Sequence, residues 1–148
     1  MTVSKVILLD TGVLGIITHP RVDREIVEWV KRLLIQGIKI KVPEISDYEL
    51  RRELIRANLK KSVERLDALK DEMGYIPIDT QSMRKAAELW ARTRNEGRPT
   101  ADDKALDGDM ILVAQALQEL NQGYEAVIAT TNVGHLSRFI DAREWKDI

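Results

Sequence analysis

Hydrophobic residues along the chain follow two spacings, one typical of buried strands and the other of amphipathic helices. Lys5–Leu9 is a short apolar run that Asp10 ends, which predicts a buried strand. Apolar residues alternate with lysines over residues 38–42, which predicts a second strand before Pro43. Further strands are predicted at residues 75–78 and 124–129, with an edge strand at 144–148.

Helical spacing separates these strands. Residues 22–35 place apolar side chains on one stripe, and Gly37 follows as a C-terminal signal. Residues 95–105 are polar and predict an exposed loop, and residues 133–139 predict a short helical turn. The other predicted helices are 45–57, 59–73, one that Asp79 caps, and one that Asp107 or Asp109 opens and that ends at Leu120.

Strands separated by helices predict an α/β fold: a three-layer sandwich with a mainly parallel sheet of four to five strands between helices. The length of 148 residues suits one domain, which we expect to span residues 1–148. In such a sheet, ligands bind beyond the carboxyl ends of the strands. We therefore expect the chemistry of this protein at that edge.

The composition narrows the possible functions. With 23 basic and 24 acidic residues the net charge is −1, which excludes a wholly basic nucleic-acid-binding protein but permits a local basic patch. The absence of cysteine excludes a disulfide framework, a zinc finger and a thiol nucleophile. The N-terminal apolar run is far shorter than the roughly 20 residues of a membrane span. We expect no membrane segment and a cytoplasmic location.

Acidic residues occur where the predicted elements would bring them together. Asp10 directly follows the first strand, and Glu49 lies in the helix after the second. Asp107 and Asp109 stand at the start of the helix before the fourth strand. Carboxylates at about 4 Å repel one another by about 4 kcal/mol per pair at an effective dielectric constant near 20. Mg²⁺ or Mn²⁺ would remove this cost, so the pattern favours metal-assisted hydrolysis of phosphodiesters.

Each of these residues also has an ordinary structural explanation. Asp10 could cap the following turn, and Glu49 could be a solvated helix residue beside surface ion pairs. Asp107 and Asp109 are favourable at any helix N-terminus, and Asn132 is a common turn residue. The metal-site hypothesis therefore depends on the whole set.

Four motifs in this sequence resemble those of PIN-domain nucleases, in particular the VapC-like toxins of bacterial toxin–antitoxin pairs. Residues 7–14 resemble the family's apolar strand followed by Asp-Thr, and residues 46–52 its Glu-Leu helix. Residues 109–116 resemble its Asp-x-x-Ile-x-Ala helix, and residues 129–136 its turn after the last central strand. The resemblance extends over nearly the whole chain.

The resemblance implies a Mg²⁺- or Mn²⁺-dependent endoribonuclease that hydrolyses RNA. It also implies a homodimer that a cognate antitoxin protein inhibits. By the same match, Asp10, Glu49 and Asp109 would be the catalytic acids, and Thr11 and Thr131 would bring hydroxyls to the site. The metal ligands would be Asp10, Asp109, Asp107 and Asn132.

Asn132 departs from the family pattern, because many members carry an acid at this position. An asparagine offers a neutral oxygen that can ligate a metal but adds no charge. The binding of a second metal ion is therefore left open.

Basic residues near the acids are candidates for contacts with RNA phosphates, although a solvated charged surface also explains them. Arg52, Arg56 and Arg98 are the predicted substrate contacts. Trp29 and Trp90 fall on apolar helix stripes, so we expect them in the core. No aromatic platform for single strands is predicted.

Two other hypotheses stay open. A catalytically weak RNA- or protein-binding module could use the same fold, which Asn132 would favour. A phosphate enzyme or phospho-acceptor domain of another class also places an aspartate after a strand. However, residues 10–13 lack the second aspartate of an Asp-x-Asp loop, and no lysine follows a late strand as receiver domains require.

Overall fold

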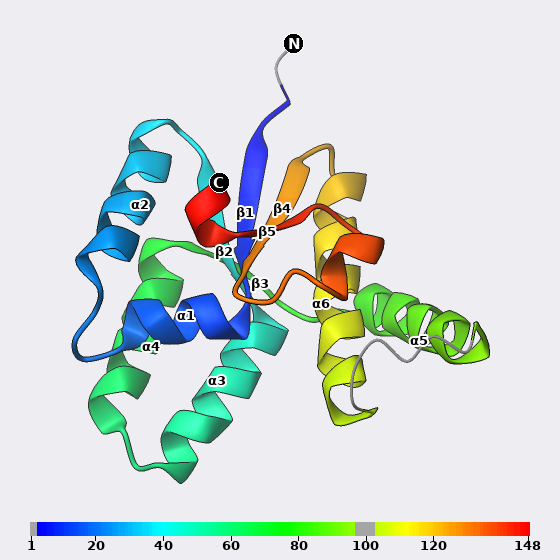
Figure 1. Ribbon diagram of the computed structural model, residues 1–148, viewed down its shortest axis with the longest axis horizontal. Helices are drawn as coiled ribbons and strands as arrows, with labels where there is room; N and C mark the ends of the chain where they lie inside the picture. The colour runs from blue at the N-terminus through cyan, green and yellow to red at the C-terminus, as the bar shows by residue number, and fades with distance from the viewer. Residues whose placement is uncertain (1–2, 97–102) are drawn as a thin grey trace.

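A parallel sheet forms the centre of the molecule in a computed structural model that describes residues 3–96 and 103–148. Its strands are β1 (Lys5–Leu9), β2 (Lys39–Pro43), β3 (Gly74–Ile76), β4 (Glu125–Thr130) and β5 (Ala142–Glu144). They lie in the order β3-β2-β1-β4-β5, and all four pairings are parallel (Figure 1). The first and fourth strands are therefore neighbours, as the predicted convergence of acids requires.

Helices cover both faces of this sheet, which confirms the predicted three-layer α/β sandwich. Helices α1, α2 and α4 lie on one side, α5 and α6 on the other, and α3 follows β2 at the carboxyl end of the strands (Figure 1). The helices are α1 (Thr11–Thr18), α2 (Arg24–Ile35), α3 (Glu44–Arg56), α4 (Lys60–Glu72), α5 (Thr80–Asn95) and α6 (Asp103–Asn121), with short 3₁₀ turns at Leu136–Arg138 and Trp145–Asp147.

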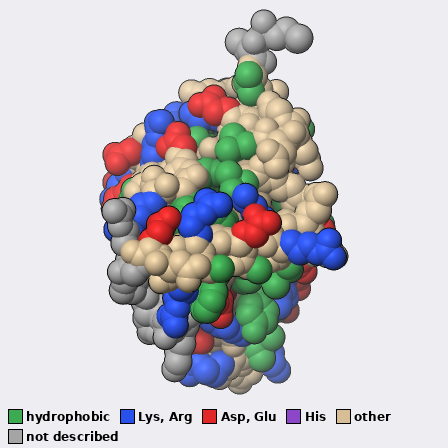
Figure 2. Space-filling view, turned by 90° about the vertical axis from the view of Figure 1, so that its right-hand side faces the viewer, with side chains coloured by type: hydrophobic (Ala, Val, Ile, Leu, Met, Phe, Trp, Pro, Cys, Tyr) green, Lys and Arg blue, Asp and Glu red, His purple; other side chains and the backbone are tan. Residues whose placement is uncertain are grey.

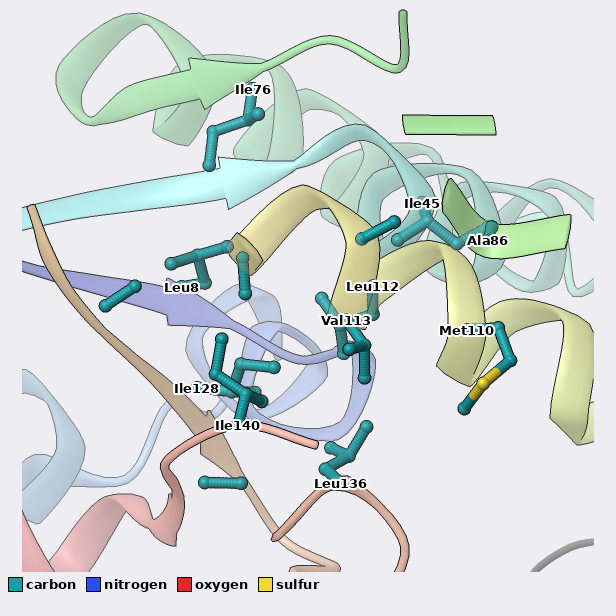
Figure 3. Close-up of a cluster of buried hydrophobic side chains, with 14 of the residues drawn as sticks. Leu8, Ile45, Ile76, Ala86, Met110, Leu112, Val113, Ile128, Leu136 and Ile140 are labelled. Atoms are coloured by element: carbon teal, nitrogen blue, oxygen red, sulfur yellow. The ribbon is translucent and has the colours of Figure 1, made fainter. Parts of the chain in front are cut away.

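Two hydrophobic cores result from the alternation of side chains along the strands. In β1, Val6 and Leu8 face α5 and α6, where the side chains in Figure 3 gather. Ile7 and Leu9 face the opposite way, into a second core with residues of α1, α2 and α4. All four side chains are fully buried. Both faces of the central strand are thus covered, which explains its uninterrupted apolar sequence.

Several boundaries differ from the prediction. The edge strand expected at residues 144–148 lies instead at Ala142–Glu144 (β5), and Trp145–Asp147 forms a 3₁₀ turn. The chain enters helix α1 directly after Asp10, where we expected only a stop to the first strand. The segment 11–18 is rich in β-branched residues and glycine, which have low helix propensity, but burial of Val13 and Leu14 stabilises the helix. Helix α6 begins at Asp103, so residues 103–105 are helical rather than part of the predicted loop.

The helix stripes are only partly buried. Trp29 lies in the core as predicted, with 4% of its surface exposed. Trp90 is 37% exposed, so the prediction that it lies in the core is wrong. Val22 and Leu34, at the ends of the predicted stripe of α2, are also exposed. Their side chains, with those of α4, line an apolar groove on the surface.

A buried ion pair ties α6 to the sheet. Lys41 Nζ of β2 lies 2.7 Å from Glu119 Oε1 near the end of α6, and the Glu119 side chain is 3% exposed. Lys39 Nζ donates a hydrogen bond to the hydroxyl of Tyr124 at 3.1 Å. Both lysines also lie over the Tyr124 ring. These contacts anchor the end of α6 that is remote from Asp109.

No helix in the described ranges has both the length and the apolar composition needed to cross a membrane.

Candidate functional site

Asp10 is fixed at the carboxyl end of the central strand. Its side chain caps helix α1, because Asp10 Oδ1 accepts a hydrogen bond from the backbone N–H of Thr11 at 2.7 Å. Asp10 Oδ2 accepts a second one from Thr130 Oγ1, also at 2.7 Å. The backbone N–H of Asp10 continues the sheet by donating to the carbonyl of Ala129. The carboxylate is therefore oriented by two neighbouring elements.

Thr130 is a site residue that the sequence analysis missed. The pairing of β1 with β4 sets Leu9 opposite Ala129, so Asp10 lies level with Thr130. The Thr130 side chain is fully buried, and its Oγ1 also accepts a hydrogen bond from the backbone N–H of Asn132 at 3.0 Å. The predicted Thr131 follows the last residue of β4 and is exposed, and its Oγ1 lies beside Gly12 of α1. The strand register therefore sets Thr130 against Asp10.

Glu49 lies on α3 and is linked to Asp10 through Thr11, the residue that follows Asp10. Thr11 Oγ1 donates a hydrogen bond to Glu49 Oε1 at 3.0 Å. Burial is the main cause that raises the pKa of Glu49, and the charge of Asp10 raises it further. The Thr11 hydrogen bond and the charge of Arg52 oppose this rise. Thr11 thus bridges two acids, whatever further role its hydroxyl has toward substrate.

Asp109 projects from the first half of α6 toward the same place. Burial raises its pKa to about 6, and the charges of Asp10 and Glu49 contribute to the rise. The pKa of a carboxyl group rises this far when like charges and a low dielectric constant together disfavour its ionised form. The three acids therefore lie within electrostatic reach of one another at the carboxyl end of the sheet.

Two glycines allow this close approach. A Cβ atom on Gly108 would lie 2.7 Å from Glu49 Oε2, so any side chain at this position would displace the Glu49 carboxylate. A Cβ atom on Gly12 would lie 2.6 Å from Thr131 Oγ1. Gly108 thus lets α6 pack directly against an acid of α3. The sequence analysis did not single out this residue, because its role depends on the packing of two helices.

The donor set suits a hydrated divalent cation. All three acids offer hard oxygen ligands, and burial together with the charges of Asp10 and Glu49 raises the pKa of Asp109, an effect that a bound dication would oppose. In the part of the chain that the structure describes, no three Asp, Glu or His side chains are close enough to enclose a metal ion by themselves. Mg²⁺ does not need such an enclosure, because it keeps several waters and takes only one or two carboxylates.

The other two predicted metal ligands, Asp107 and Asn132, are exposed. Asp107 is exposed and lines a groove between α5 and α6, together with Met83 and Trp90. Asp107 stands two residues before Asp109, so the two side chains leave helix α6 in directions more than half a turn apart. Asn132 is exposed beyond β4, and its backbone rather than its side chain contacts Thr130.

The predicted substrate-binding arginines also differ in their surroundings. The guanidinium of Arg52 lies over the Tyr48 ring, and its charge lowers the pKa of Glu49. Arg56 is exposed and pairs with Glu53 at 2.9 Å. Arg98 lies outside the described residues.

Comparisons with known proteins agree with this fold. The model of the PIN domain family matches residues 7–130. No curated protein sequence matches the chain. Among solved structures, VapBC2 from Rickettsia felis, bound to a DNA fragment from their promoter, is similar with a TM-score of 0.75 and 15% identity, over 95% of this chain and 98% of that one.

Two further structures have the same fold. FitAcB from Neisseria gonorrhoeae gives a TM-score of 0.67 at 20% identity and covers 96% of this chain and 99% of the other. VapBC-1 from nontypeable Haemophilus influenzae gives a TM-score of 0.66 at 21% identity and covers 95% of this chain and 98% of the other. At these identities the likeness establishes the fold alone.

Proposed function

Because this chain belongs to the PIN domain family, we propose that it is a divalent-metal-dependent endoribonuclease, with Asp10, Glu49 and Asp109 as its catalytic acids. The observation that carries this proposal is the packing of the three acids: Thr11 is hydrogen-bonded to both Asp10 and Glu49, and Gly108, next to Asp109, lies against the Glu49 carboxylate. Three mutually repelling carboxylates at the end of a parallel sheet are costly unless a cation shares them.

The residues of the site would have separate roles. Asp10 and Asp109 would hold Mg²⁺ or Mn²⁺, with Asp107 and Asn132 as further predicted ligands through water. Thr130 fixes the Asp10 carboxylate, and Thr11 fixes that of Glu49. When bound, the dication would supply Lewis-acid stabilisation of the phosphate and activation of a water molecule. Thr131, Arg52, Arg56 and Arg98 remain the predicted contacts with RNA.

The biological setting that we propose is a toxin–antitoxin pair in the cytoplasm. The similar structures carry the paired names VapBC and FitAcB, and each matches 95% or 96% of this chain. We therefore propose a cognate antitoxin as a protein partner, and a homodimer as the form in which this chain acts. Copurification with the product of an adjacent small gene would test the first of these.

RNA cleavage by the purified protein tests the proposed activity. We expect cleavage with Mn²⁺, its loss on addition of EDTA, and a decrease of at least about 100-fold in Asp10→Asn and Asp109→Asn. Asp71→Asn is the matched control, because Asp71 is an exposed acid on α4 far from the site in sequence. Undiminished cleavage by Asp10→Asn and Asp109→Asn would refute the assignment.

The binding-module hypothesis makes a different prediction. Asn132 replaces an acid of the family pattern, which is the feature that favours it. A protein of this kind would bind no Mn²⁺ at millimolar concentration in a calorimetric titration and would retain affinity for RNA or protein. Detectable Mn²⁺ binding that Asp109→Asn abolishes would favour the nuclease.

A further inference from the structure

An exposed aromatic ring lies beside the acidic site. Tyr48 directly precedes Glu49 on α3, and 55% of its surface is exposed to solvent. The central carbon of the Arg52 guanidinium lies 5.1 Å from the centre of the Tyr48 ring. A cation at this distance interacts favourably with the ring and restricts the motion of both side chains. Tyr48 and Arg52 thus form a small preorganised surface, which we call the Tyr48–Arg52 pair.

Arg52 connects this pair to the chemistry. It follows Glu49 by three residues, so the two side chains lie on adjoining turns of one helix face. The guanidinium charge acts on the Glu49 carboxylate, as its effect on the pKa of that residue shows. Among the described residues, no carboxylate forms a salt bridge with Arg52. Its donors are therefore available to a phosphate that approaches the acids.

The neighbouring arginines are engaged differently. Arg51 donates to both oxygens of Asp47 and to Asp67, which fixes it between α3 and α4. Arg56 pairs with Glu53 in an exposed position one turn beyond Arg52. On this helix, Arg52 alone of the three combines a contact with an exposed aromatic ring and an electrostatic link to an acid of the site.

We propose that Tyr48 is a substrate-binding residue on whose ring an unpaired RNA base stacks, next to the phosphate that enters the acidic site, with Arg52 contacting the adjacent backbone. The proposal rests on the proposed nuclease function and defines its substrate as single-stranded. Stacking on an aromatic ring is strong and tolerant of base identity. It suits a chain whose net charge of −1 gives little general attraction to nucleic acid.

The expectation that the chain offers no aromatic platform is thereby revised. Aromatic residues are few in the sequence, and Trp29 lies in the core. Tyr48 belongs to no apolar stripe, and helical spacing alone does not indicate its position beside the site. Because its side chain is exposed, it can be replaced with little effect on the packing of α3.

Binding of RNA in EDTA tests the proposal without dependence on cleavage. The probe is a short fluorescein-labelled single-stranded RNA of mixed sequence, measured by anisotropy at low salt. We expect Tyr48→Ala to weaken binding about tenfold, and Tyr48→Trp to retain wild-type affinity, because the stacking surface is kept. Lys85→Ala removes an exposed cation that pairs with Glu88 on α5, so it is the control and should bind like the wild type. A fully paired RNA should bind both Tyr48→Ala and wild type equally, because its bases are not free to stack.

Several results would overturn the proposal. Equal affinity of Tyr48→Ala and wild type for the single strand would exclude stacking. A change from dimer to monomer in Tyr48→Ala, measured by light scattering after size exclusion, would instead place Tyr48 in an interface between copies. If Mn²⁺-dependent cleavage is absent while single-strand binding still depends on Tyr48, the stacking proposal survives and the nuclease assignment fails.

Discussion

The Asp109 carboxylate makes an unfavourable contribution to folding at neutral pH. Its pKa rises from 3.8 to about 6 in the folded protein, mainly through burial and then through Asp10 and Glu49. The folded state therefore binds a proton more tightly than the unfolded chain does. Stability gained from this group is present below about pH 4 and is lost as the pH rises through about 6.

Replacement of Asp109 by asparagine should therefore stabilise the metal-free protein. We expect Asp109→Asn to raise the free energy of unfolding by about 1–2 kcal/mol at neutral pH in EDTA, after allowance for solvent screening of this partly exposed group. Urea denaturation between about pH 4 and pH 8 checks this, since the advantage should disappear at the acidic end. Asp71→Asn, at an exposed position, should show no such trend. A variant less stable than wild type at neutral pH would contradict the inferred repulsion.

Gly108 controls the position of a second acid. In Gly108→Ala the new methyl group would meet Glu49 Oε2 at 2.7 Å, so the carboxylate or α6 must shift. We expect RNA cleavage to fall about tenfold or more, because a small misplacement of a catalytic group is costly. Gly15→Ala is the control, because its methyl group would only make ordinary contact with Leu50 at 3.7 Å. Wild-type cleavage by Gly108→Ala would show that Glu49 does not need this position.

At the level of elements, Arg51 joins α3 to α4. Both its hydrogen bonds to Asp47 are 3.0 Å long, and that to Asp67 is 2.7 Å. Arg51→Ala leaves Asp47, which is 6% exposed, buried without its cation. We expect a loss of about 2 kcal/mol in the free energy of unfolding, measured by urea denaturation. Arg56→Ala removes an exposed pair and should cost less than about 0.5 kcal/mol. Equal effects of the two substitutions would contradict this role.

The sequence predicts most elements because their local signals agree with their burial. Lys5–Leu9 has the predicted bounds, and Asp79 caps α5 as expected, by accepting from the Ser82 N–H. Helix α1 was missed because its residues 11–18 are poor helix formers that depend on tertiary packing. The start of α6 was placed too late because polar residues 103–105 give no apolar periodicity.

At the scale of the whole molecule, charge is spread rather than concentrated. The side that α5 and α6 cover shows lysine and arginine side chains interspersed with acidic ones (Figure 2). Together with the net charge of −1, this pattern gives no broad basic surface for nucleic acid on that side. We therefore expect the proposed RNA binding to depend on the groups around the acids.

The site could be foreseen from the sequence only as far as topology determines it. Asp10, Glu49 and Asp109 follow from the rule that ligands bind beyond the carboxyl ends of parallel strands, given neighbouring first and fourth strands. The hydrogen bond from Thr130 to Asp10 depends on a strand register that no local pattern reveals. The position of Asp107 on a different side of α6 depends on how that helix is rotated about its axis.

Helix α6 carries Asp109 near one end and Glu119, paired with Lys41, near the other. At about 1.5 Å per residue these two positions lie about 15 Å apart along the helix axis. Lys41 and Glu119 also line a surface pocket of about 210 Å³. A ligand that enters this pocket and separates Lys41 from Glu119 would release the far end of the helix that carries Asp109.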